Sequence, residues 1–477
     1  MSNSILHSED SAVSVSSQTR VTEDLGAGGL DPDRFDWQEA WYPVHYIEDL
    51  DKSRPTRFTL LDQDIVLWWD KNQQMWRAFV DQCPHRLVPL SEGRINSDGL
   101  LECPYHGWAF SGTGECVSIP QQVEGGKAEL SQRACCRSLP TTVRTGLLFV
   151  YPGCSENAAK TKVPVVDILE EETDGWICLK TFRDLPYDAL TLMENVLDTS
   201  HIPYTHHRTV GNRANVSAVE LEVVESGKWG FKGSWAQGPR KGTLGRQDTT
   251  FIAPGLMWHD LTSKQFGRTL TVVYATPIRK GECRLFALFP FKFSAKLPGF
   301  LMKLTPRWYS HIGQNGVLED DQIFLHYQER YLEKRGGSAN FTKAFYLPTK
   351  ADLFTYQLRS WVKQYSAEPF PGKTLPPPLQ LEALLDRYHS HTEKCTSCST
   401  ALTNLQRLKL GVAVVGVLSW GLLPMSMFIS THTHSISISI STLVVIIAAG
   451  IWFGLSNLER KFYQGRKVPP RNLPEKN

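Results

Sequence analysis

The sequence lacks the signals of several large protein classes. It contains no G-x-G-x-x-G fingerprint, the usual sign of a dinucleotide-binding domain. The formal net charge is only +2 over 477 residues, which gives no reason to expect a nucleic-acid partner. Ten cysteines are too few for a disulfide scaffold in a chain of this length, and no secretory signal opens it. We therefore expect a reducing compartment, where clustered cysteine and histidine indicate metal binding.

The chain divides into segments of different composition. Residues 1–34 are polar and Ser-rich without apolar periodicity, which predicts a flexible tail, and their acidic residues argue against a transit peptide. Residues 35–155 carry short apolar runs broken by Gly, Pro, Asn and Asp, a pattern typical of a small all-β domain. Examples are Phe58–Leu61, Ile65–Trp69 and Gly146–Tyr151.

Residues 163–367 mix alternating strands with helical stretches, which predicts an α+β domain with a broad antiparallel sheet. The expected strands are Glu220–Glu225, Lys228–Trp235 and Leu270–Ala275, with a hairpin turn in Arg279–Arg284. Residues 368–405 then form a Pro-rich linker, a short helix expected over Leu379–Tyr388, and a Cys-x-x-Cys segment.

Two uncharged apolar runs, Leu410–Ser430 and roughly Ser435–Leu455, lie within residues 410–455. Each has about the 20 residues that cross a bilayer, so we expect a transmembrane helical hairpin rather than a hairpin buried in a soluble core. The link between them has no Lys or Arg, whereas basic residues stand outside the pair, notably in the tail 456–477. The positive-inside rule therefore places the folded bulk of the chain on the cytoplasmic or stromal side. Phe289–Trp308, rich in Leu, aromatic and basic residues, predicts either a membrane-surface helix or one packed on the sheet.

The first chemical motif pairs Cys83-Pro84-His85 with Cys103-Pro104-Tyr105-His106. Two thiolates and two imidazoles are the ligands of a Rieske [2Fe–2S] cluster, in which one iron takes both cysteines and the other takes both histidines. A zinc site has the same composition but more often pairs like with like, as C-x₂-C and H-x₃-H. Here each segment carries one Cys and one His, which fits two chemically distinct irons better. We assign Cys83, His85, Cys103 and His106 to the cluster.

The second motif is Glu194–His207, which reads ENVLDTSHIPYTHH. Two histidines and one carboxylate form the facial triad that holds Fe(II) and leaves positions open for O₂. His201 and His206 are the expected pair. Five residues apart, they would point away from each other on a straight helix, so we expect Pro203 to break the helix and bring both imidazoles to one metal. His207 is the competing ligand and should point elsewhere.

The carboxylate of this triad must come from a distant segment. Asp320 and Asp321, in the run LEDDQIFL, are the best candidates. Taken alone, an acidic run of this kind is typical of a solvated helix face, and only the two-histidine motif upstream favours a metal-binding role. Between the two acids we favour Asp321.

Across nearly all of residues 35–365 the sequence resembles the Rieske non-haem iron oxygenases. The matching motifs are CPHR at 83–86, CPYHGW at 103–108 and ENVLDTSHIPYTHH at 194–207. The resemblance implies an α+β fold with a β-rich Rieske domain and a helix-grip-like iron domain, assembled as a homotrimer. It also implies catalytic roles for Asn195 and Asp198. Asp198 would link His201 of its own subunit to His106 of the neighbouring subunit.

More narrowly, CPHRLVPLSEGRI at 83–95, the Cys-x-x-Cys motif and the paired apolar runs resemble the branch that contains pheophorbide a oxygenase, the lethal-leaf-spot proteins and the translocon-associated Rieske protein. This resemblance implies mono-oxygenation of a chlorophyll-derived tetrapyrrole at a cyanobacterial membrane, the chloroplast envelope or the thylakoid. Alternatives are hydroxylation of a linear tetrapyrrole and a redox-sensing subunit of a membrane protein-import complex. Without a dinucleotide fingerprint, a ferredoxin or ferredoxin-type reductase must supply the electrons.

Cys395 and Cys398 admit three interpretations. In a reducing compartment a Cys-x-x-Cys pair can be a redox dithiol, which we favour. Nearby His389 and His391 would instead complete a zinc site. The third interpretation is two idle reduced thiols.

Overall fold

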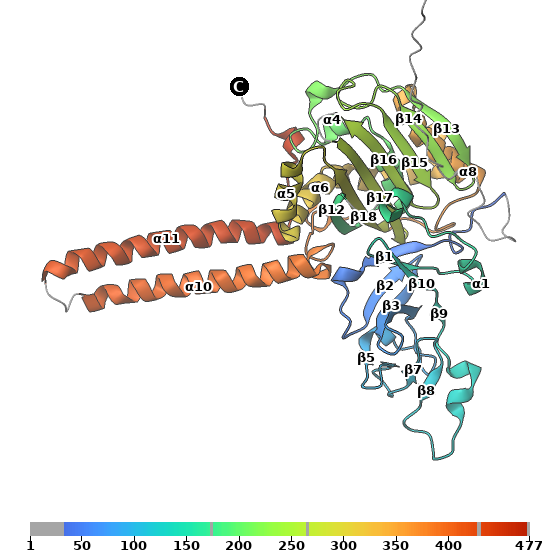
Figure 1. Ribbon diagram of the computed structural model, residues 1–477, viewed down its shortest axis with the longest axis horizontal. Helices are drawn as coiled ribbons and strands as arrows, with labels where there is room; N and C mark the ends of the chain where they lie inside the picture. Colours follow the sequence, from blue (N-terminus) through green and yellow to red (C-terminus); the bar gives the residue numbers. More distant parts are fainter. Residues whose placement is uncertain (1–32, 172–174, 264–266, 427–430, 475–477) are drawn as a thin grey trace, which may run out of the picture.

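The computed structural model describes residues 33–171, 175–263, 267–426 and 431–474. The tail expected over residues 1–34 therefore lies almost entirely outside the described residues. The described part forms an elongated body with a broad upper end and a narrow lower end (Figure 1). A long helical hairpin projects sideways from this body (Figure 1).

The narrow end of the body is built from three small antiparallel sheets between residues 42 and 150. The sheet nearest the rest of the body has the order β1 (Tyr42–Tyr46), β11 (Leu147–Val150), β10 (Thr141–Arg144). The next has the order β2 (Thr56–Leu60), β3 (Gln63–Asp70), β4 (Met75–Val80), β9 (Ser138–Leu139). The outermost has the order β5 (Arg94–Ile95), β6 (Leu101–Glu102), β7 (Ala109–Phe110), β8 (Cys116–Ser118).

The broad end is a seven-stranded antiparallel sheet. Its order is β12 (Ile177–Leu185), β18 (Glu282–Lys292), β17 (Gly267–Arg279), β16 (Leu256–Ser263), β15 (Gln247–Ile252), β14 (Gly230–Trp235), β13 (Leu221–Gly227). In the centre, Cys283–Leu288 of β18 is buried without interruption because both faces are covered, by helix α3 (Ala189–Leu197) and by the narrow end. At the edge of the sheet, β13 alternates between exposed and more buried positions, as expected for a strand with one solvent-exposed face.

Three helices cover the sheet and position the sites described below. Helix α3 contacts β16, β17 and β18; α8 (Leu353–Gln364) contacts β13; and α6 (Arg307–Lys334) contacts β12. The shorter helices are α1 (Ser155–Ala158), α2 (Asp167–Glu171), α4 (Ile202–Thr205), α5 (Lys296–Leu304), α7 (Phe341–Ala344) and α9 (Leu381–Leu384). The predicted α+β fold is confirmed. The helix expected over Leu379–Tyr388 is wrong in extent, because only the single turn α9 forms there.

The projecting hairpin consists of α10 (Thr396–Ser426) and α11 (Thr431–Tyr463), which pack along each other (Figure 1). Both helices are long and apolar enough to cross a membrane, and only 11% and 6% of their apolar windows are buried, which argues against a hairpin in a soluble core. Both helices extend beyond the apolar runs. Thr431–His434, which lies between the two runs and was expected to form the link, is instead the start of α11. Residues 427–430 lie outside the described part of the chain.

A buried ionic cluster fastens the base of the hairpin to the sheet. Glu319 of α6 is 3% exposed and accepts hydrogen bonds from Arg183 of β12 at 2.9 Å and from Arg387 at 2.5 and 2.7 Å. Arg387 also donates to the carbonyl of Lys461 at 2.8 Å, near the end of α11. Burial raises the pKa of Glu319, but hydrogen bonds and charge from the two guanidiniums outweigh that effect and leave the pKa lowered. The carboxylate is therefore charged when the protein is folded.

Replacing Glu319 with Ala should destabilise the protein by about 3–5 kcal/mol, because it removes the carboxylate that two buried guanidiniums share as an acceptor. The melting temperature of the detergent-purified protein checks this. The control is Glu382→Ala, which removes an exposed ion pair with Lys467 and should leave the melting temperature unchanged. Equal melting temperatures for the two variants would contradict the role given to Glu319.

Candidate functional site

The two cluster-binding loops share one backbone plan. In each loop the cysteine N–H donates a hydrogen bond to the carbonyl five residues later, at 2.9 Å for Cys83 and 2.8 Å for Cys103. The N–H four residues later donates back to the cysteine carbonyl, at 2.8 Å from Leu87 and 3.2 Å from Gly107. Leu87 and Gly107 both have positive φ, +61° and +71°. Each of the two matched turns therefore presents one Cys and one His from nearby positions in the sequence.

The four side chains of these loops converge at the narrow end of the body. Cys83 and Cys103 are buried, and the rings of His85 and His106 lie 4.6 Å apart between centroids. His85 stacks on Trp108 with ring planes only 5° apart, which fixes its orientation. Its buried Nδ1 has no hydrogen-bond partner among the described residues. Two thiols, two imidazoles and an unpartnered ring nitrogen are a donor set that fits a Rieske cluster.

The second motif folds differently from the expectation about Pro203. Helix α3 ends at Leu197, where Asp198 takes an extended conformation, and Pro203 lies in the first turn of the separate helix α4. The predicted break at Pro203 is therefore wrong in place, because proline is well tolerated at a helix start, where its missing N–H has no partner to lose. His201 precedes α4 and His206 follows it, so their Nε2 atoms lie 3.3 Å apart.

Asp321, on α6, completes a group with these histidines. Its carboxylate oxygens lie 3.8 Å from His201 Nε2 and 3.3 Å from His206 Nε2. Asp320 contacts the other side of His206: its Oδ2 lies 3.4 Å from Nδ1 and accepts a hydrogen bond from Thr209 at 2.9 Å. The two adjacent acids therefore occupy different places, one facing the group and one behind it.

Hydrogen bonds orient both imidazoles toward Asp321. His201 Nδ1 donates to the main-chain carbonyl of Asp198 at 2.5 Å, and His206 Nδ1 faces Asp320, so both Nε2 lone pairs point into the group. Burial raises the pKa of Asp321, an effect opposed by His201, His206 and a 3.2 Å hydrogen bond from Asn195. A buried carboxylate facing two imidazole lone pairs fits a divalent cation with open positions, as in the facial triad of non-haem iron.

The remaining predicted residues lie around this group. The carboxylate of Asp198 accepts from the N–H and hydroxyl of Ser200, at 2.7 and 2.6 Å, and its nearer oxygen to His201 Nδ1 is 4.0 Å away. The main-chain carbonyl of Asp198, and not its carboxylate, therefore accepts the hydrogen bond from His201. His207 Nδ1 accepts from the N–H of Arg213 at 3.2 Å, and His207 is not part of the group.

One contact near the site carried no signal in the sequence. Arg471, in the C-terminal segment, donates to the carbonyls of Thr205 at 3.2 Å and Asp320 at 2.5 Å, each next to a member of the histidine–aspartate group. The basic tail was expected only to flank a membrane helix. Its contact with the site depends on the chain folding back after α11, which no local pattern reveals.

Cys395 and Cys398 lie in a different buried group, with His311 and His391. His389, which the sequence paired with His391, is exposed and bonded to Asp386 at 2.6 Å. His311 comes from α6, and no pattern near the Cys-x-x-Cys motif indicates it.

The chain matches known proteins over most of its length. A model of the Rieske [2Fe-2S] domain matches residues 40–142, and a model named Pheophorbide a oxygenase matches residues 251–339. Pheophorbide a oxygenase, chloroplastic, of Oryza sativa subsp. japonica is 38% identical over 415 residues, covering 80% of this chain and 77% of that protein. Flavonoid 8-hydroxylase 2, chloroplastic, of Ocimum basilicum is 35% identical over 419 residues, covering 81% and 77%. Among solved structures, NdmB of Pseudomonas putida CBB5 aligns with a TM-score of 0.56 at 21% identity, covering 69% of this chain and 91% of that chain.

These matches confirm the resemblance inferred from the motifs, and the solved structure confirms the fold. The family implies a Rieske [2Fe–2S] cluster and a mononuclear non-haem iron as cofactors, which agrees with the two donor sets in the structure. This chain belongs to the pheophorbide a oxygenase family of Rieske non-haem iron oxygenases.

Proposed function

We propose that this protein is a membrane-bound mono-oxygenase that uses O₂ and ferredoxin-type electrons to oxygenate a chlorophyll-derived tetrapyrrole. The observation that carries the proposal is the group of His201, His206 and Asp321, of which His206 and Asp321 are buried, in a chain that also has a Rieske ligand set. A plain electron carrier would need only the Rieske ligands. The relative named pheophorbide a oxygenase supports the substrate class.

In this assignment the cluster is held by Cys83, His85, Cys103 and His106, and the iron by His201, His206 and Asp321. When bound, the cluster would supply single electrons, and ferrous iron with open positions would supply the means to activate O₂. The protein orients the ligands. The Asp198 carbonyl and the Asp320 carboxylate each engage the outer nitrogen of one imidazole and so hold Nε2 toward Asp321.

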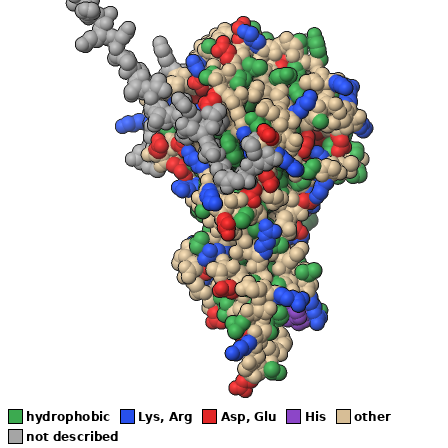
Figure 2. All heavy atoms as spheres, turned by 90° about the vertical axis from the view of Figure 1, so that its right-hand side faces the viewer, with side chains coloured by type: hydrophobic (Ala, Val, Ile, Leu, Met, Phe, Trp, Pro, Cys, Tyr) green, Lys and Arg blue, Asp and Glu red, His purple; other side chains and the backbone are tan. Residues whose placement is uncertain are grey.

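A homotrimer is part of the proposal because the two donor sets lie far apart in one chain. The cluster-binding loops are at the narrow lower end of the body and α4 is at the broad upper end (Figure 1). The narrow end presents histidine side chains at its surface, with Lys and Arg beside them (Figure 2). In a head-to-tail ring this end would meet the iron site of a second copy, and Asp198 would lie opposite His106 of the partner subunit.

Membrane attachment is supported by more than the hairpin. Helix α5 contacts β12 and carries four exposed apolar side chains. They are Leu297, Phe300, Leu301 and Leu304, between 55% and 65% exposed. With Lys296 and Lys303 on the same helix, this composition suits the boundary between lipid head groups and acyl chains. We propose that α5 rests on a chloroplast or cyanobacterial membrane, on the stromal or cytoplasmic side, from which an apolar substrate enters.

A second substrate class is favoured by one observation. The relative named flavonoid 8-hydroxylase 2 is nearly as similar to this chain as the relative named pheophorbide a oxygenase. Both names describe planar conjugated molecules. A flavone and a linear tetrapyrrole therefore belong in every substrate assay beside pheophorbide a.

The reduced, detergent-purified protein, incubated anaerobically with pheophorbide a and then given a pulse of O₂, should yield a product whose mass has gained oxygen. His201→Ala should yield none, because one of the two imidazoles that face Asp321 is lost. The control is His207→Ala, which should retain activity, since the His207 ring is bonded to the Arg213 N–H and lies outside the group.

Mass spectrometry of the pigments measures the outcome. If none of the three substrates gains oxygen while the protein holds its full iron content, the catalytic proposal fails. A redox-sensing or import role would then remain, since such a role should survive His201→Ala.

The two adjacent acids should differ in their effect on iron content. Asp321→Ala should reduce iron from three to two per chain, leaving the cluster spectrum intact. Asp320→Asn should retain three, because Asp320 contacts His206 Nδ1 and Thr209 rather than the face of the group where Nε2 points. Iron and sulfide determination on the purified variants checks this. Loss of iron from Asp320→Asn together with retention in Asp321→Ala would reverse the assignment.

Asp198→Asn should keep both metal centres and the trimer but slow cluster reoxidation by about 10–100-fold, because the carboxylate that would face His106 of the partner subunit is lost and removal of such a partner usually costs that much activity. Its matched control is Glu220→Gln, an exposed acid on the same domain. Stopped-flow absorbance of the pre-reduced cluster, mixed with O₂ and substrate, measures the rate. An unchanged rate would exclude Asp198 as the link between subunits.

A further inference from the structure

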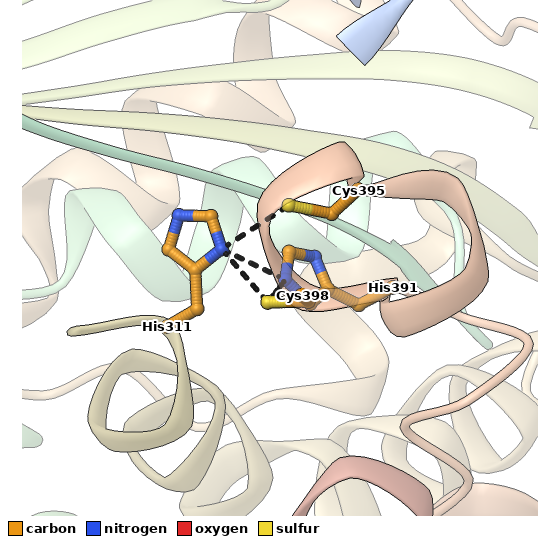
Figure 3. A group of neighbouring side chains, drawn as sticks. All are labelled: His311, His391, Cys395 and Cys398. Carbon is orange, nitrogen blue, oxygen red and sulfur yellow. Dashed lines mark hydrogen bonds between the residues drawn. The ribbon is translucent and has the colours of Figure 1, made fainter. Parts of the chain in front are cut away.

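Four metal-binding side chains meet at the base of the hairpin, away from both iron-binding sets. His311 comes from α6, His391 and Cys395 from the turn just before α10, and Cys398 from the first turn of α10 (Figure 3). All four are buried, and their donor atoms lie within 4.8 Å of one another. No carboxylate takes part in the group.

The spacing of these atoms suits a single tetrahedral ion. His311 Nδ1 lies 3.5 Å from Cys395 Sγ and 3.4 Å from Cys398 Sγ, and His391 Nε2 lies 3.4 Å from Cys398 Sγ. The two ring nitrogens are 3.0 Å apart. Zinc bonds of about 2.3 Å to sulfur and about 2.0–2.1 Å to nitrogen give a tetrahedron with edges of about 3.3–3.8 Å. A [2Fe–2S] cluster would need a wider separation of its two ligand pairs.

The outer nitrogens of both imidazoles are already committed to the main chain. His311 Nε2 donates to the carbonyl of Lys180 at 2.8 Å, and His391 Nδ1 donates to the carbonyl of Phe182 at 2.6 Å, both on β12. Each neutral ring therefore turns a lone pair inward. The two inward nitrogens, His311 Nδ1 and His391 Nε2, lie 3.0 Å apart, and neither carries a proton that could form a hydrogen bond between them. A cation between them relieves this repulsion. Bonding of the outer nitrogen to a carbonyl is the usual support of a metal-bound histidine.

We propose that His311, His391, Cys395 and Cys398 bind one structural Zn²⁺. Two imidazoles and two thiolates are a set that zinc prefers, and the ion with two thiolates is neutral overall, which suits a site without exposed surface. All four positions are taken by protein, so the site is closed and has no place for substrate. Cys395 and Cys398 are 0% and 2% exposed, whereas a dithiol that exchanges with a partner thiol must be reachable.

The proposed site joins the membrane hairpin to the catalytic domain. Its ligands come from α6, from the turn just before α10 and from the first turn of α10, and both imidazoles are hydrogen-bonded to β12. Helix α6 also carries Asp321, ten residues and about 15 Å beyond His311 along one rigid helix. The ion would therefore hold together the hairpin base and the helix that supplies the iron-site carboxylate.

The test is metal analysis of the full-length protein, purified in detergent without chelators. The expected result is one zinc per chain beside the iron, with zinc X-ray absorption showing two sulfur and two nitrogen neighbours. Cys398→Ser and His311→Ala should each lose the zinc and keep the [2Fe–2S] absorption spectrum. Matched controls are His389→Ala, an exposed histidine in the same segment, and Cys154→Ser, an exposed cysteine elsewhere. Both should keep the zinc.

The absorption measurement uses the unmodified protein and so stands even if a variant fails to fold. Iron-replete protein without zinc would overturn the proposal, as would a fourth iron in its place. A Cys395–Cys398 disulfide, seen as the loss of two hydrogens in the peptide mass, would assign the pair to redox chemistry instead. Zinc that persists in Cys398→Ser with unchanged neighbours would place the ion elsewhere.

Discussion

Three consecutive buried carboxylates on helix α6 are the constraint on which the rest of the structure depends. Glu319, Asp320 and Asp321 are each at most 5% exposed, and an unpaired buried charge costs several kcal/mol. The fold supplies a different partner for each. Glu319 takes two guanidiniums, Asp320 takes His206 and Thr209, and Asp321 takes two imidazoles and Asn195. The residues that face His201 and His206 are thus part of a set of buried carboxylates on one helix, each neutralised by its own partners.

The same helix connects chemistry to membrane attachment. Through Glu319 and Arg387 it is bonded to the end of α11, and through His311 it reaches the start of α10. After α11 the chain returns to the histidine–aspartate group, where Arg471 donates to the carbonyls of Thr205 and Asp320, next to His206 and Asp321. The hairpin is therefore held at both of its ends by the domain that carries His201, His206 and Asp321.

Local spacing was enough to predict much of the fold and the donor sets. Several strands of both domains followed from apolar runs between turn residues, and the proposed cluster ligands lie in two short loops, so their chemistry is visible in the sequence. Asp321 was harder to separate from Asp320, since adjacent residues on a helix differ by about 100° and packing alone decides which one faces the imidazoles. His311 could not be predicted, because it lies 80 residues from His391 and reaches it only when α6 packs on β12. The break at Pro203 was misplaced because proline starts a helix as readily as it ends one.

The central claim is that one chain holds two chemically different iron centres. Mössbauer spectroscopy of the protein, purified after growth on isotope-enriched iron, tests it most directly. The account predicts two components in a ratio of two to one: a [2Fe–2S] pair with one cysteine-bound and one histidine-bound iron, and a separate high-spin ferrous ion that disappears in Asp321→Ala. A spectrum with cluster iron alone, or with a single kind of iron throughout, would contradict it.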